Sequence, residues 1–173
     1  MKFGKCNHYG IVVKDINKAM DEYSKAFGIK HWYMLNATPF EEFEYLGEAK
    51  NCDVTLYFGG KGTTKIELIE TKGDDNYYTD FYKAHGEAIH HVMYNTKDLD
   101  KSIEEMTNEG YTMIQRAKFK AGGAGVRYAY MTKNETEVTI ELIETTLPLG
   151  IKKGDMPFEL QLGCLTGSHK KIR

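Results

Sequence analysis

Cysteine is scarce in this sequence of 173 residues. Only Cys6, Cys52 and Cys164 occur, so their number is odd, and no two of them are spaced as CxxC. Widely separated thiols of this kind are typical of reduced cysteines in a cytoplasmic protein, whereas a disulfide framework or a zinc knot needs closer pairs. We therefore expect a cytoplasmic protein without structural disulfides.

Long apolar runs and an excess of charge of one sign are also missing. No apolar stretch approaches the roughly 20 residues that span a membrane, and the N-terminus Met-Lys-Phe-Gly-Lys-Cys-Asn-His has no apolar core of a secretory signal. Lys and Arg number 23 and Asp and Glu 25, which gives a formal charge of −2. This balance gives no electrostatic reason to expect nucleic acid or a membrane as a partner.

What the sequence does contain is a repeat. The segment Ile-Glu-Leu-Ile-Glu-Thr occupies residues 66–71 and again residues 140–145. A second pair of segments, which begin at His8 and at His91, also aligns through a shared Lys-Asp and a following Lys. An identity of six residues by chance is improbable in so short a chain, so the repeats indicate an internal duplication. Each half opens with a His and closes with a Glu.

The two halves predict the same order of elements, β-α-β-β-β. Apolar residues at helical spacing follow the capping residues Asp15 and Asp98 and stop at Gly28 and Gly110, which predicts one helix per half. β-branched and alternating apolar residues predict four strands per half. The expected strands cover residues 6–13, 31–35, 53–58 and 64–70 in the first half, and 88–95, 111–115, 126–131 and 138–144 in the second.

These elements divide the chain into four parts. We expect a first module over 1–74, a helical connector over 75–85, a second module over 86–146 and a C-terminal extension over 147–173. The acidic, irregular stretch 36–52 predicts a long loop. The extension lies outside the duplication and ends in basic residues, and we expect it to lie against the surface or a partner chain.

Strand alternation predicts where the repeated glutamates point. In the first repeat Ile66 and Leu68 share the face that packs beneath a helix, so Glu67 points to the opposite face. The same alternation applies to Glu141 in the second repeat. Taken alone, a Glu between apolar strand residues is more often a solvated residue on the open side of a sheet.

Alternation also decides between two adjacent histidines. Only one of His90 and His91 can join Glu67 and Glu141 on one face, and the repeat register selects His91, the counterpart of His8. His90 should then face the helix layer. A lone strand His is more often a hydrogen-bonded residue than a ligand, but two His and two Glu at duplicated positions form a set of metal ligands. Carboxylates clustered away from water carry a large desolvation cost unless a cation lies among them.

Several motifs resemble the vicinal oxygen chelate superfamily, which includes glyoxalase I, methylmalonyl-CoA epimerase, extradiol dioxygenases and bleomycin-resistance proteins. The motifs most resemble the methylmalonyl-CoA epimerase type. They are His8-Tyr-Gly-Ile-Val-Val-Lys-Asp, Tyr23-Ser-Lys-Ala-Phe-Gly, Lys83-Ala-His-Gly-Glu-Ala-Ile-His-His91 and Val138-Thr-Ile-Glu-Leu. Epimerases commonly have Gln at the position of Glu67, whereas the bacterial glyoxalase I type has Glu.

The resemblance implies an α+β fold in which two tandem βαβββ modules form a curved, cleft-lining, eight-stranded mixed sheet with helices outside. It also implies one divalent metal ion (Zn, Ni, Co, Mn or Fe), bound by His8, Glu67, His91 and Glu141, and a homodimer. The implied substrate is a small molecule of the acyl-CoA or glutathione thiohemiacetal class.

Such a site predicts removal of a proton next to a carbonyl or thioester, with a metal-stabilised enolate. The first candidate for the base is Glu141, the second is Glu67, and Glu48 in the acidic stretch is a weaker one. Candidate substrate-binding cations flank the Gly-rich segment 121–125, where backbone amides could hold an anion. They are Lys118, Lys120 and Arg127, for which solvated surface charge is the alternative explanation.

Three functions therefore stay open. The first is a metal-dependent epimerase, isomerase or lyase, including lactoylglutathione lyase. The second is an iron extradiol dioxygenase with His8, His91 and Glu141 as a two-His-one-carboxylate triad, although Glu67 would occupy a position that dioxygen or a catechol needs. The third is a metal-free small-molecule binding protein.

Overall fold

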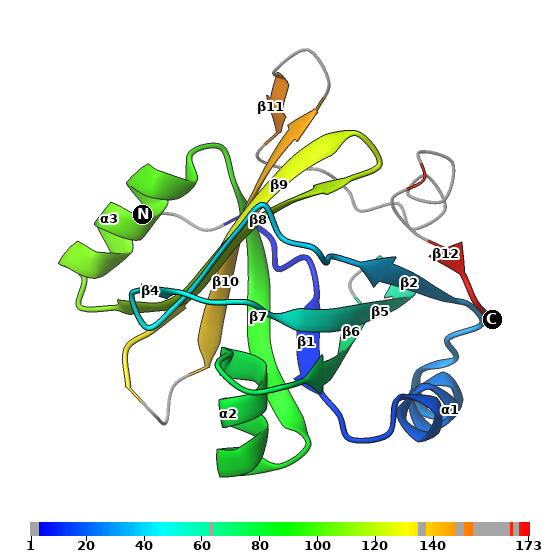
Figure 1. Ribbon diagram of the computed structural model, residues 1–173. Coiled ribbons are helices and arrows are strands. Elements are labelled where there is room, and N and C mark those ends of the chain that lie inside the picture. Colours follow the sequence, from blue (N-terminus) through cyan, green and yellow to red (C-terminus); the bar gives the residue numbers. More distant parts are fainter. Residues whose placement is uncertain (1–3, 63, 135–137, 148–150, 154–166, 168–169) are drawn as a thin grey trace.

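A single curved sheet carries most of the chain (Figure 1). The computed structural model describes residues 4–62, 64–134, 138–147, 151–153, 167 and 170–173. Its helices are α1 (Ile16–Phe27), α2 (Tyr77–His85) and α3 (Leu99–Asn108). Its strands are β1 (Tyr9–Val12), β2 (Trp32–Asn36), β3 (Glu42–Tyr45), β4 (Glu48–Ala49), β5 (Asp53–Lys61), β6 (Thr64–Lys72), β7 (Ala88–Thr96), β8 (Thr112–Ala121), β9 (Ala124–Thr132), β10 (Thr139–Leu147), β11 (Ile151–Lys153) and β12 (Lys170–Lys171).

The sheet consists of two equivalent halves. The strand order is β12-β2-β5-β6-β1-β7-β10-β9-β8-β3-β4, and β11 pairs with β10 beside this path. In each half the first strand runs parallel to the last, β1 to β6 and β7 to β10, and the antiparallel pair β1–β7 joins the halves. The predicted pair of βαβββ modules is confirmed. The predicted number of eight strands is wrong, because β3, β4, β11 and β12 extend the sheet of the described residues to twelve.

Helix α1 covers the outer face of the first half. Its N-cap Asp15 accepts hydrogen bonds from the backbone N–H groups of Asn17 and Lys18, both at 3.0 Å, and it ends at Gly28, whose φ of 65° suits a residue without Cβ. Its buried face, which includes Met20, packs against Ile66 and Leu68 of β6. The alternation predicted for this strand is therefore present.

Helix α3 covers the second half in the same way. Asp98 accepts a hydrogen bond from the Lys101 N–H at 3.1 Å, and Leu99 and Met106 pack against Leu142 of β10 and the outer residues of β9. In Figure 1, α1 and α3 lie at opposite ends of the sheet. The duplicated strands thus bury one side of each repeat beneath a helix and turn the other side toward the concave face.

The predicted long loop over 36–52 is wrong in part. It contains the hairpin β3–β4, and β3 pairs antiparallel with β8 of the other half. The segment Glu42-Phe43-Glu44-Tyr45 alternates charged and aromatic residues, which is the period of a strand, and Phe43 and Tyr45 are buried. Glu42 and Glu44 lie on the other face of β3, where they form ion pairs with Lys118 and Arg116 of β8.

The Gly-rich segment 121–125 is a tight turn of a β-hairpin. Ala121 pairs with Ala124, and Gly122 and Gly123 between them have φ values of 56° and 82°. Positive φ at both central residues is the requirement of a type I′ turn. The glycines are thus explained by hairpin geometry.

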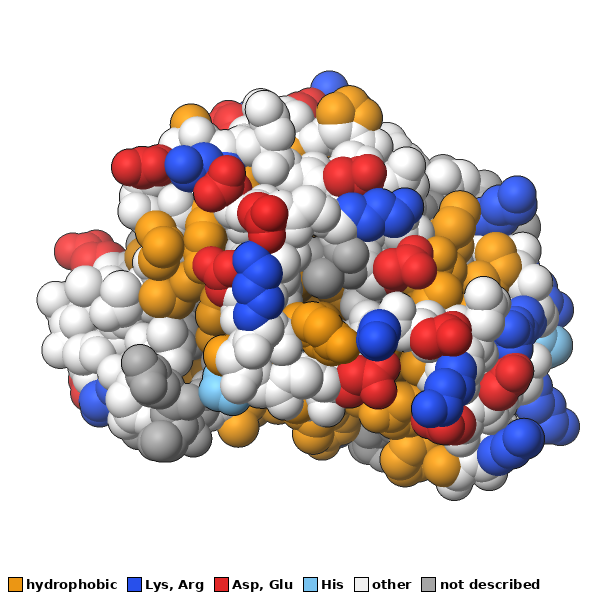
Figure 2. Space-filling view, turned by 60° about the horizontal axis from the view of Figure 1, so that its bottom comes forward, with side chains coloured by type: hydrophobic (Ala, Val, Ile, Leu, Met, Phe, Trp, Pro, Cys, Tyr) orange, Lys and Arg blue, Asp and Glu red, His pale blue; other side chains and the backbone are white. Residues whose placement is uncertain are grey.

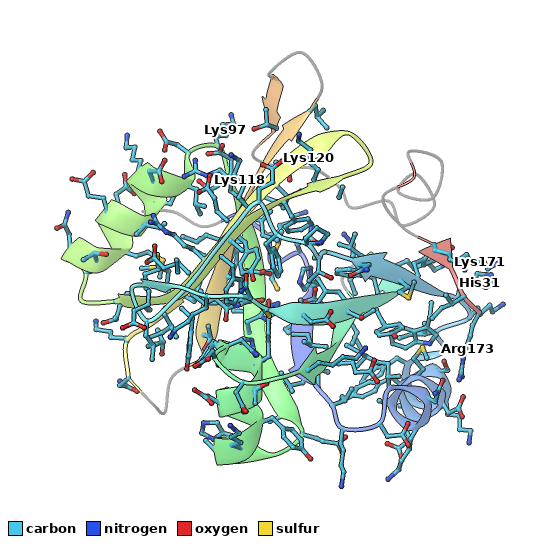
Figure 3. The ribbon with its side chains drawn as sticks, viewed as in Figure 1. His31, Lys97, Lys118, Lys120, Lys171 and Arg173 are labelled. Atoms are coloured by element: carbon cyan, nitrogen blue, oxygen red, sulfur yellow. The ribbon has the colours of Figure 1, made fainter. Side chains whose placement is uncertain are left out.

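The end of the extension returns to the first half. Lys170 and Lys171 form β12, which pairs with β2, and Arg173 forms polar contacts with Asn17 and Asp21 of α1. Figure 3 shows Lys171 and Arg173 beside α1 and β2. This part of the extension lies against the surface, as predicted, whereas Cys164 lies outside the described residues.

Candidate metal centre

The two predicted His ligands approach each other across the junction of the halves. His8 directly precedes β1, and His91 lies in β7 opposite Gly10. Their Nε2 atoms are 3.3 Å apart. Gly10 makes this approach possible, because a Cβ at this position would lie 2.0 Å from Cε1 of His91. The signal in the sequence was a Gly within a strand, which often marks a close approach.

The two predicted Glu ligands come from the repeated strands. Glu67 of β6 pairs with Gly10 of β1, and Glu141 of β10 pairs with Met93 of β7. Because their neighbours Leu68 and Leu142 pack beneath α1 and α3, both glutamates point to the concave face. Each half therefore supplies one His and one Glu.

The four side chains converge on a common point. Nε2 of His91 lies 3.1 Å from Oε2 of Glu67 and 3.2 Å from Oε2 of Glu141. Nε2 of His8 lies 3.4 and 3.5 Å from the same two atoms. Donors about 2.1 Å from one ion are separated by about 3.0 Å at right angles and about 3.4 Å in a tetrahedron. The observed spacings fit one first-row divalent ion.

The four side chains of this cluster are buried, and their pKa values are shifted by burial and by one another. His8, Glu67 and Glu141 are 6%, 4% and 4% exposed, and His91 is 0% exposed. Burial lowers the pKa of both imidazoles, but the two carboxylates outweigh it and raise the pKa of His8, and that of His91 to about 9. Burial raises the pKa of both carboxyl groups, but the imidazoles outweigh it and lower both values.

Protonation of the histidines alone does not satisfy the hydrogen-bonding needs of the two carboxylates. Among the described residues, neither Oε2 of Glu67 nor Oε2 of Glu141 has a hydrogen-bond partner, although both are near imidazole nitrogens. Two protonated imidazoles would also place two N–H groups face to face at 3.3 Å. A divalent cation would neutralise the charge of the two carboxylates and could be coordinated by all four side chains. The residues therefore fit a metal site.

The neighbouring His90 is buried but takes no direct part in the cluster. The β1–β7 register shifts between Gly10, opposite His91, and Ile11, opposite Ile89, so His90 is an extra residue of β7. Because of this bulge, His90 does not turn to the outer helix layer as predicted. It packs against Tyr77 of α2, with ring centroids 4.6 Å apart.

Aromatic rings enclose the cluster. The ring of Phe58 meets His8 edge-on at 5.7 Å, and the ring of Tyr130 lies 5.1 Å from His91. The Tyr130 hydroxyl is 3.1 Å from that of Tyr78 on α2, which is 3.1 Å from that of Tyr128. These residues, which the sequence reasoning did not single out, form the wall between the cluster and the rest of the concave face.

Two elements cover this wall. Helix α2 packs against β6, β7 and β1, and the hairpin β3–β4 contributes Phe43 and Tyr45 to the same apolar cluster as Tyr78. The Tyr45 hydroxyl donates a hydrogen bond of 2.6 Å to Oδ2 of Asp80 on α2. The hairpin and α2 are thereby joined to each other over the concave face.

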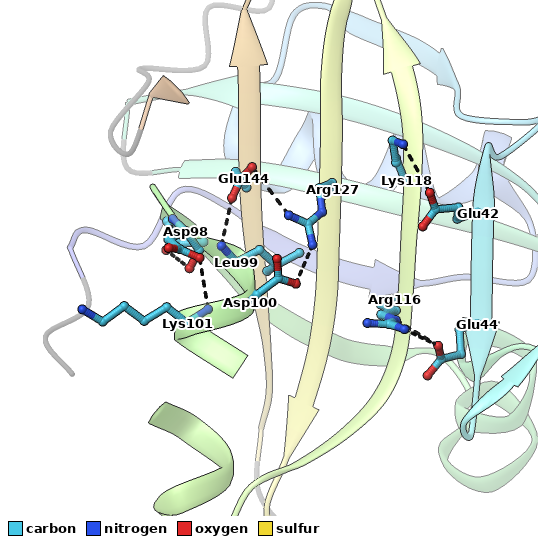
Figure 4. A network of polar contacts seen from close by, with 11 residues as sticks. Glu42, Glu44, Asp98, Leu99, Asp100, Lys101, Arg116, Lys118, Arg127 and Glu144 are labelled. Atoms are coloured by element: carbon cyan, nitrogen blue, oxygen red, sulfur yellow. Dashed lines mark hydrogen bonds and ion pairs between the residues drawn. The ribbon is translucent and has the colours of Figure 1, made fainter. Parts of the chain in front are cut away.

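The predicted substrate-binding cations lie on the other face of the sheet. Arg127 pairs with Glu144, three residues beyond Glu141, so alternation directs its side chain away from the cluster. Lys118 pairs with Arg127 and shares that face. Arg127 contacts Asp100, and Lys118 contacts Glu42 (Figure 4).

The remaining predicted residues are also on the surface. Lys120 lies near Lys118 in β8 (Figure 3) and forms an ion pair of 3.2 Å with Glu41. Glu48, the weaker candidate base, is exposed on β4 and forms an ion pair of 2.9 Å with Lys50. The roles proposed for these residues stay predictions.

A cavity of about 960 Å³ lies beside the covering hairpin. Its described lining includes Phe40 and Phe43, the cations Lys118 and Arg127, and Tyr128. The four cluster residues do not line it. Tyr128 is nevertheless two residues from Tyr130, which contacts His91, so this cavity and the cluster share one aromatic wall.

The molecular surface shows no dominant charge on the face viewed in Figure 2, where Lys and Arg side chains alternate with Asp and Glu. In the part of the chain that the structure describes, no helix has the length and apolar character of a membrane span.

Comparison with known proteins agrees with this geometry. A family model described as the glyoxalase/bleomycin resistance protein/dioxygenase superfamily matches residues 7–130, which contain His8, Glu67 and His91. An uncharacterized protein of Bacillus subtilis (strain 168) is 26% identical over 141 residues, 81% of this chain and 91% of that protein. The mitochondrial methylmalonyl-CoA epimerase of Mus musculus is 24% identical over 131 residues, 75% and 67% of the two chains.

The fold is shared with solved structures. A methylmalonyl-CoA epimerase variant of Streptomyces coelicolor in complex with 2-nitronate-propionyl-CoA superposes with a TM-score of 0.54 at 18% identity, covering 82% of this chain and 94% of that chain. Because the family model covers most of the sequence and the described fold agrees with it, this chain belongs to the glyoxalase/bleomycin resistance protein/dioxygenase superfamily.

Proposed function

We propose that this protein is a metal-dependent isomerase that removes a proton next to the carbonyl of an acyl thioester and returns it. The observation that carries the proposal is the convergence of His8, Glu67, His91 and Glu141, whose buried carboxylate oxygens have no hydrogen-bond partner among the described residues. The similarity to methylmalonyl-CoA epimerases supports an acyl-CoA substrate.

The residues of the cluster fit a Lewis-acid reaction. A divalent ion held by these four donors would polarise the carbonyl oxygen of the substrate and stabilise the enolate formed when the proton leaves. A carboxylate with a pKa of about 4 is too weak a base to deprotonate an unactivated carbon. The cluster therefore needs its cation for the reaction, and the carboxylates need no unusual basicity.

The two glutamates are suited to move the proton. Oε2 of each glutamate lies among the four metal donors and accepts no hydrogen bond from a described residue, so each carboxylate would leave the ion when it acts on the substrate. We assign proton removal to Glu141 and return of the proton on the other side of the carbon to Glu67. An epimerisation requires this pair of positions, because the proton must come back to the opposite face.

The enclosure of the cluster by Phe58, Tyr130 and Tyr78 would exclude water and so strengthen the electrostatic interactions within it. Substrate entry then requires the covering elements to move. The cavity beside Tyr128 adjoins this aromatic wall, whereas its lining cations Lys118 and Arg127 extend from the other face of the sheet and pair with Glu42 and Asp100.

A second candidate is lactoylglutathione lyase, which Glu67 favours because the bacterial glyoxalase I type has Glu at this position. Its reaction also moves a proton next to a carbonyl. The extradiol dioxygenase is less favoured, because Glu67 lies within 3.1–3.4 Å of both His ligands and would occupy one of the positions that two oxygen ligands need.

The decisive experiment is deuterium exchange. Protein purified without chelator should exchange the α-proton of methylmalonyl-CoA with deuterium from solvent faster than a protein-free control, and should stop when the metal is removed. NMR or mass spectrometry would follow the exchange. The hemithioacetal of methylglyoxal and glutathione is the second substrate, and oxygen uptake with catechols tests the dioxygenase.

Glu141→Gln should abolish exchange, because it removes both a charge and the proposed base. Glu70→Gln is the matched control. Glu70 lies on β6 three residues after Glu67, on the opposite face of the strand. Loss of exchange in both variants, or exchange that continues without metal, would contradict the proposal. A protein that binds no metal would leave the metal-free binding function.

A further inference from the structure

His90 is a buried polar side chain among aromatic rings, and this packing alone does not explain why the residue is polar. Its side chain is 1% exposed, yet its Nδ1 lies 3.0 Å from Nδ1 of His91. The β-bulge at His90 brings the two neighbouring rings to the same side, with centroids 5.3 Å apart. In a regular strand the two side chains would point to opposite faces.

The contact between the two Nδ1 atoms has only one workable proton arrangement when His91 is a ligand. Nε2 of His91 faces Glu67 and Glu141, so this nitrogen must be unprotonated to bind an ion. The neutral ring then carries its proton on Nδ1 and donates it to Nδ1 of His90. His90 in turn carries its own proton on Nε2.

We propose that His90 is a positioning residue that accepts a hydrogen bond from His91 Nδ1 and thereby holds His91 in the tautomer whose Nε2 can bind a divalent ion. The inference rests on the metal binding in the proposed function and on none of its substrates. It explains why His90 precedes His91 although only His91 is a proposed ligand.

The surroundings of His90 support this role. Its ring is held between Tyr77 and Phe81 of α2, at 4.6 and 4.9 Å, and Tyr130 of β9, at 4.9 Å. Tyr130 also packs against His91. The aromatic contacts fix the orientation of the His90 ring, so that its Nδ1 stays directed at His91.

The choice of a neutral acceptor has an electrostatic consequence. Ligand histidines commonly donate their second N–H to a carboxylate or a backbone carbonyl. A carboxylate at position 90 would add a third negative charge beside Glu67 and Glu141, and the net charge with a divalent ion would fall from zero to −1. The neutral imidazole of His90 orients His91 without adding this charge. The ion would therefore polarise a substrate more strongly than it would beside a third carboxylate.

Two substitutions separate the hydrogen bond from the packing. His90→Phe keeps an aromatic ring but removes the acceptor. His90→Asn loses the ring but can place its carbonyl Oδ1 about where Nδ1 lies. Phe119→Leu is the packing control, because it alters the same apolar cluster at the rings of Phe40 and Tyr128 rather than at His90.

Zinc affinity of the full chain, measured by chelator competition without substrate, is the first readout. His90→Phe should bind Zn²⁺ about 10- to 100-fold more weakly, the usual effect of removing the partner of a ligand. His90→Asn should recover most of the loss, and Phe119→Leu should remain within about 3-fold of the wild type. Equal affinity of His90→Phe and wild type would overturn the inference and leave the proposed function intact.

The second readout needs no variant and is independent of folding defects. ¹⁵N NMR of the zinc-loaded wild type should show His91 protonated on Nδ1 and His90 protonated on Nε2 only. A proton on Nδ1 of His90 would overturn the inference. A wild type that binds no zinc would overturn both the inference and the proposed function, so the two failures are distinguishable.

Discussion

Gly10 is the residue whose absent side chain shapes the candidate site. The ring of His91 occupies the space that a Cβ at position 10 would need, with Cε1 at 2.0 Å and both ring nitrogens at 2.4 Å. Contacts this short involve a ring held on several sides by His8, His90 and Tyr130, so the ring cannot yield without leaving the cluster.

Gly10→Ala should therefore displace His91 and weaken Zn²⁺ binding by about 10²-fold or more, with a loss of stability of about 1–3 kcal/mol from overpacking. Isothermal titration and denaturant unfolding would measure the two effects. Gly125→Ala is the control, because a Cβ there would meet its nearest neighbour at 3.9 Å, an ordinary contact. Unchanged zinc affinity in Gly10→Ala would show that the His91 ring can move without loss.

The repeated segment contains two glutamates that strand alternation separates. Glu67 and Glu141 reach the cluster, whereas Glu144, three residues further on, accepts a hydrogen bond of 2.9 Å from the Leu99 N–H at the start of α3. A carboxylate at a helix N-terminus is favourable because it meets the unpaired N–H groups there. One repeated sequence thus supplies a site residue and a residue that anchors a helix.

Glu67→Gln distinguishes a ligand from a base. The amide oxygen of Gln can still bind an ion, so we expect metal binding to be largely retained. If Glu67 also moves a proton, α-proton exchange should fall by roughly 10²-fold or more, the usual contribution of a general base. Glu70→Gln should change neither property. Full exchange activity in Glu67→Gln would limit Glu67 to metal binding.

At the scale of elements, the covering hairpin and α2 decide access to the cluster. The Tyr45–Asp80 hydrogen bond links the side chains of β3 and α2. The pKa of Tyr45 is raised, mainly by burial and also by the Asp80 carboxylate. The bond is short and charge-assisted, and such bonds contribute more than neutral ones.

Tyr45→Phe keeps the buried ring and removes this link. We expect a loss of about 1–2 kcal/mol of stability and a several-fold faster release of bound zinc to excess chelator, because the cover opens more often. Stopped-flow with a chromogenic chelator would measure the rate. Tyr111→Phe, on the far side of the sheet near Lys133, is the control. An unchanged release rate would mean that metal leaves by another path.

At the scale of the whole molecule, the cluster joins the two halves of the chain. His8 and Glu67 come from the first half, and His91 and Glu141 from the second, and the strands that carry them meet at the β1–β7 junction. An ion bound by all four would link both modules, and it would bind the folded state much better than the unfolded chain.

Metal removal should therefore lower the unfolding temperature. At free zinc about 1,000-fold above the dissociation constant, binding should add about 4 kcal/mol of stability, and chelator should reverse the shift. Differential scanning calorimetry with and without zinc would test this. The double variant His8→Ala/Glu141→Ala should show no zinc-dependent shift, and a shift that persisted in it would place the metal elsewhere.

The duplication, the βαβββ order and the four converging residues can all be predicted from the sequence, because a repeat fixes equivalent positions and a strand period of two fixes the face of each residue. The sequence also contained the alternation of β3, hidden among acidic residues. The elements that cover the cluster and the face to which His90 points cannot be predicted from the sequence. Pairing of β3 with β8 and the bulge in β7 depend on contacts between distant segments, and no local period encodes these contacts.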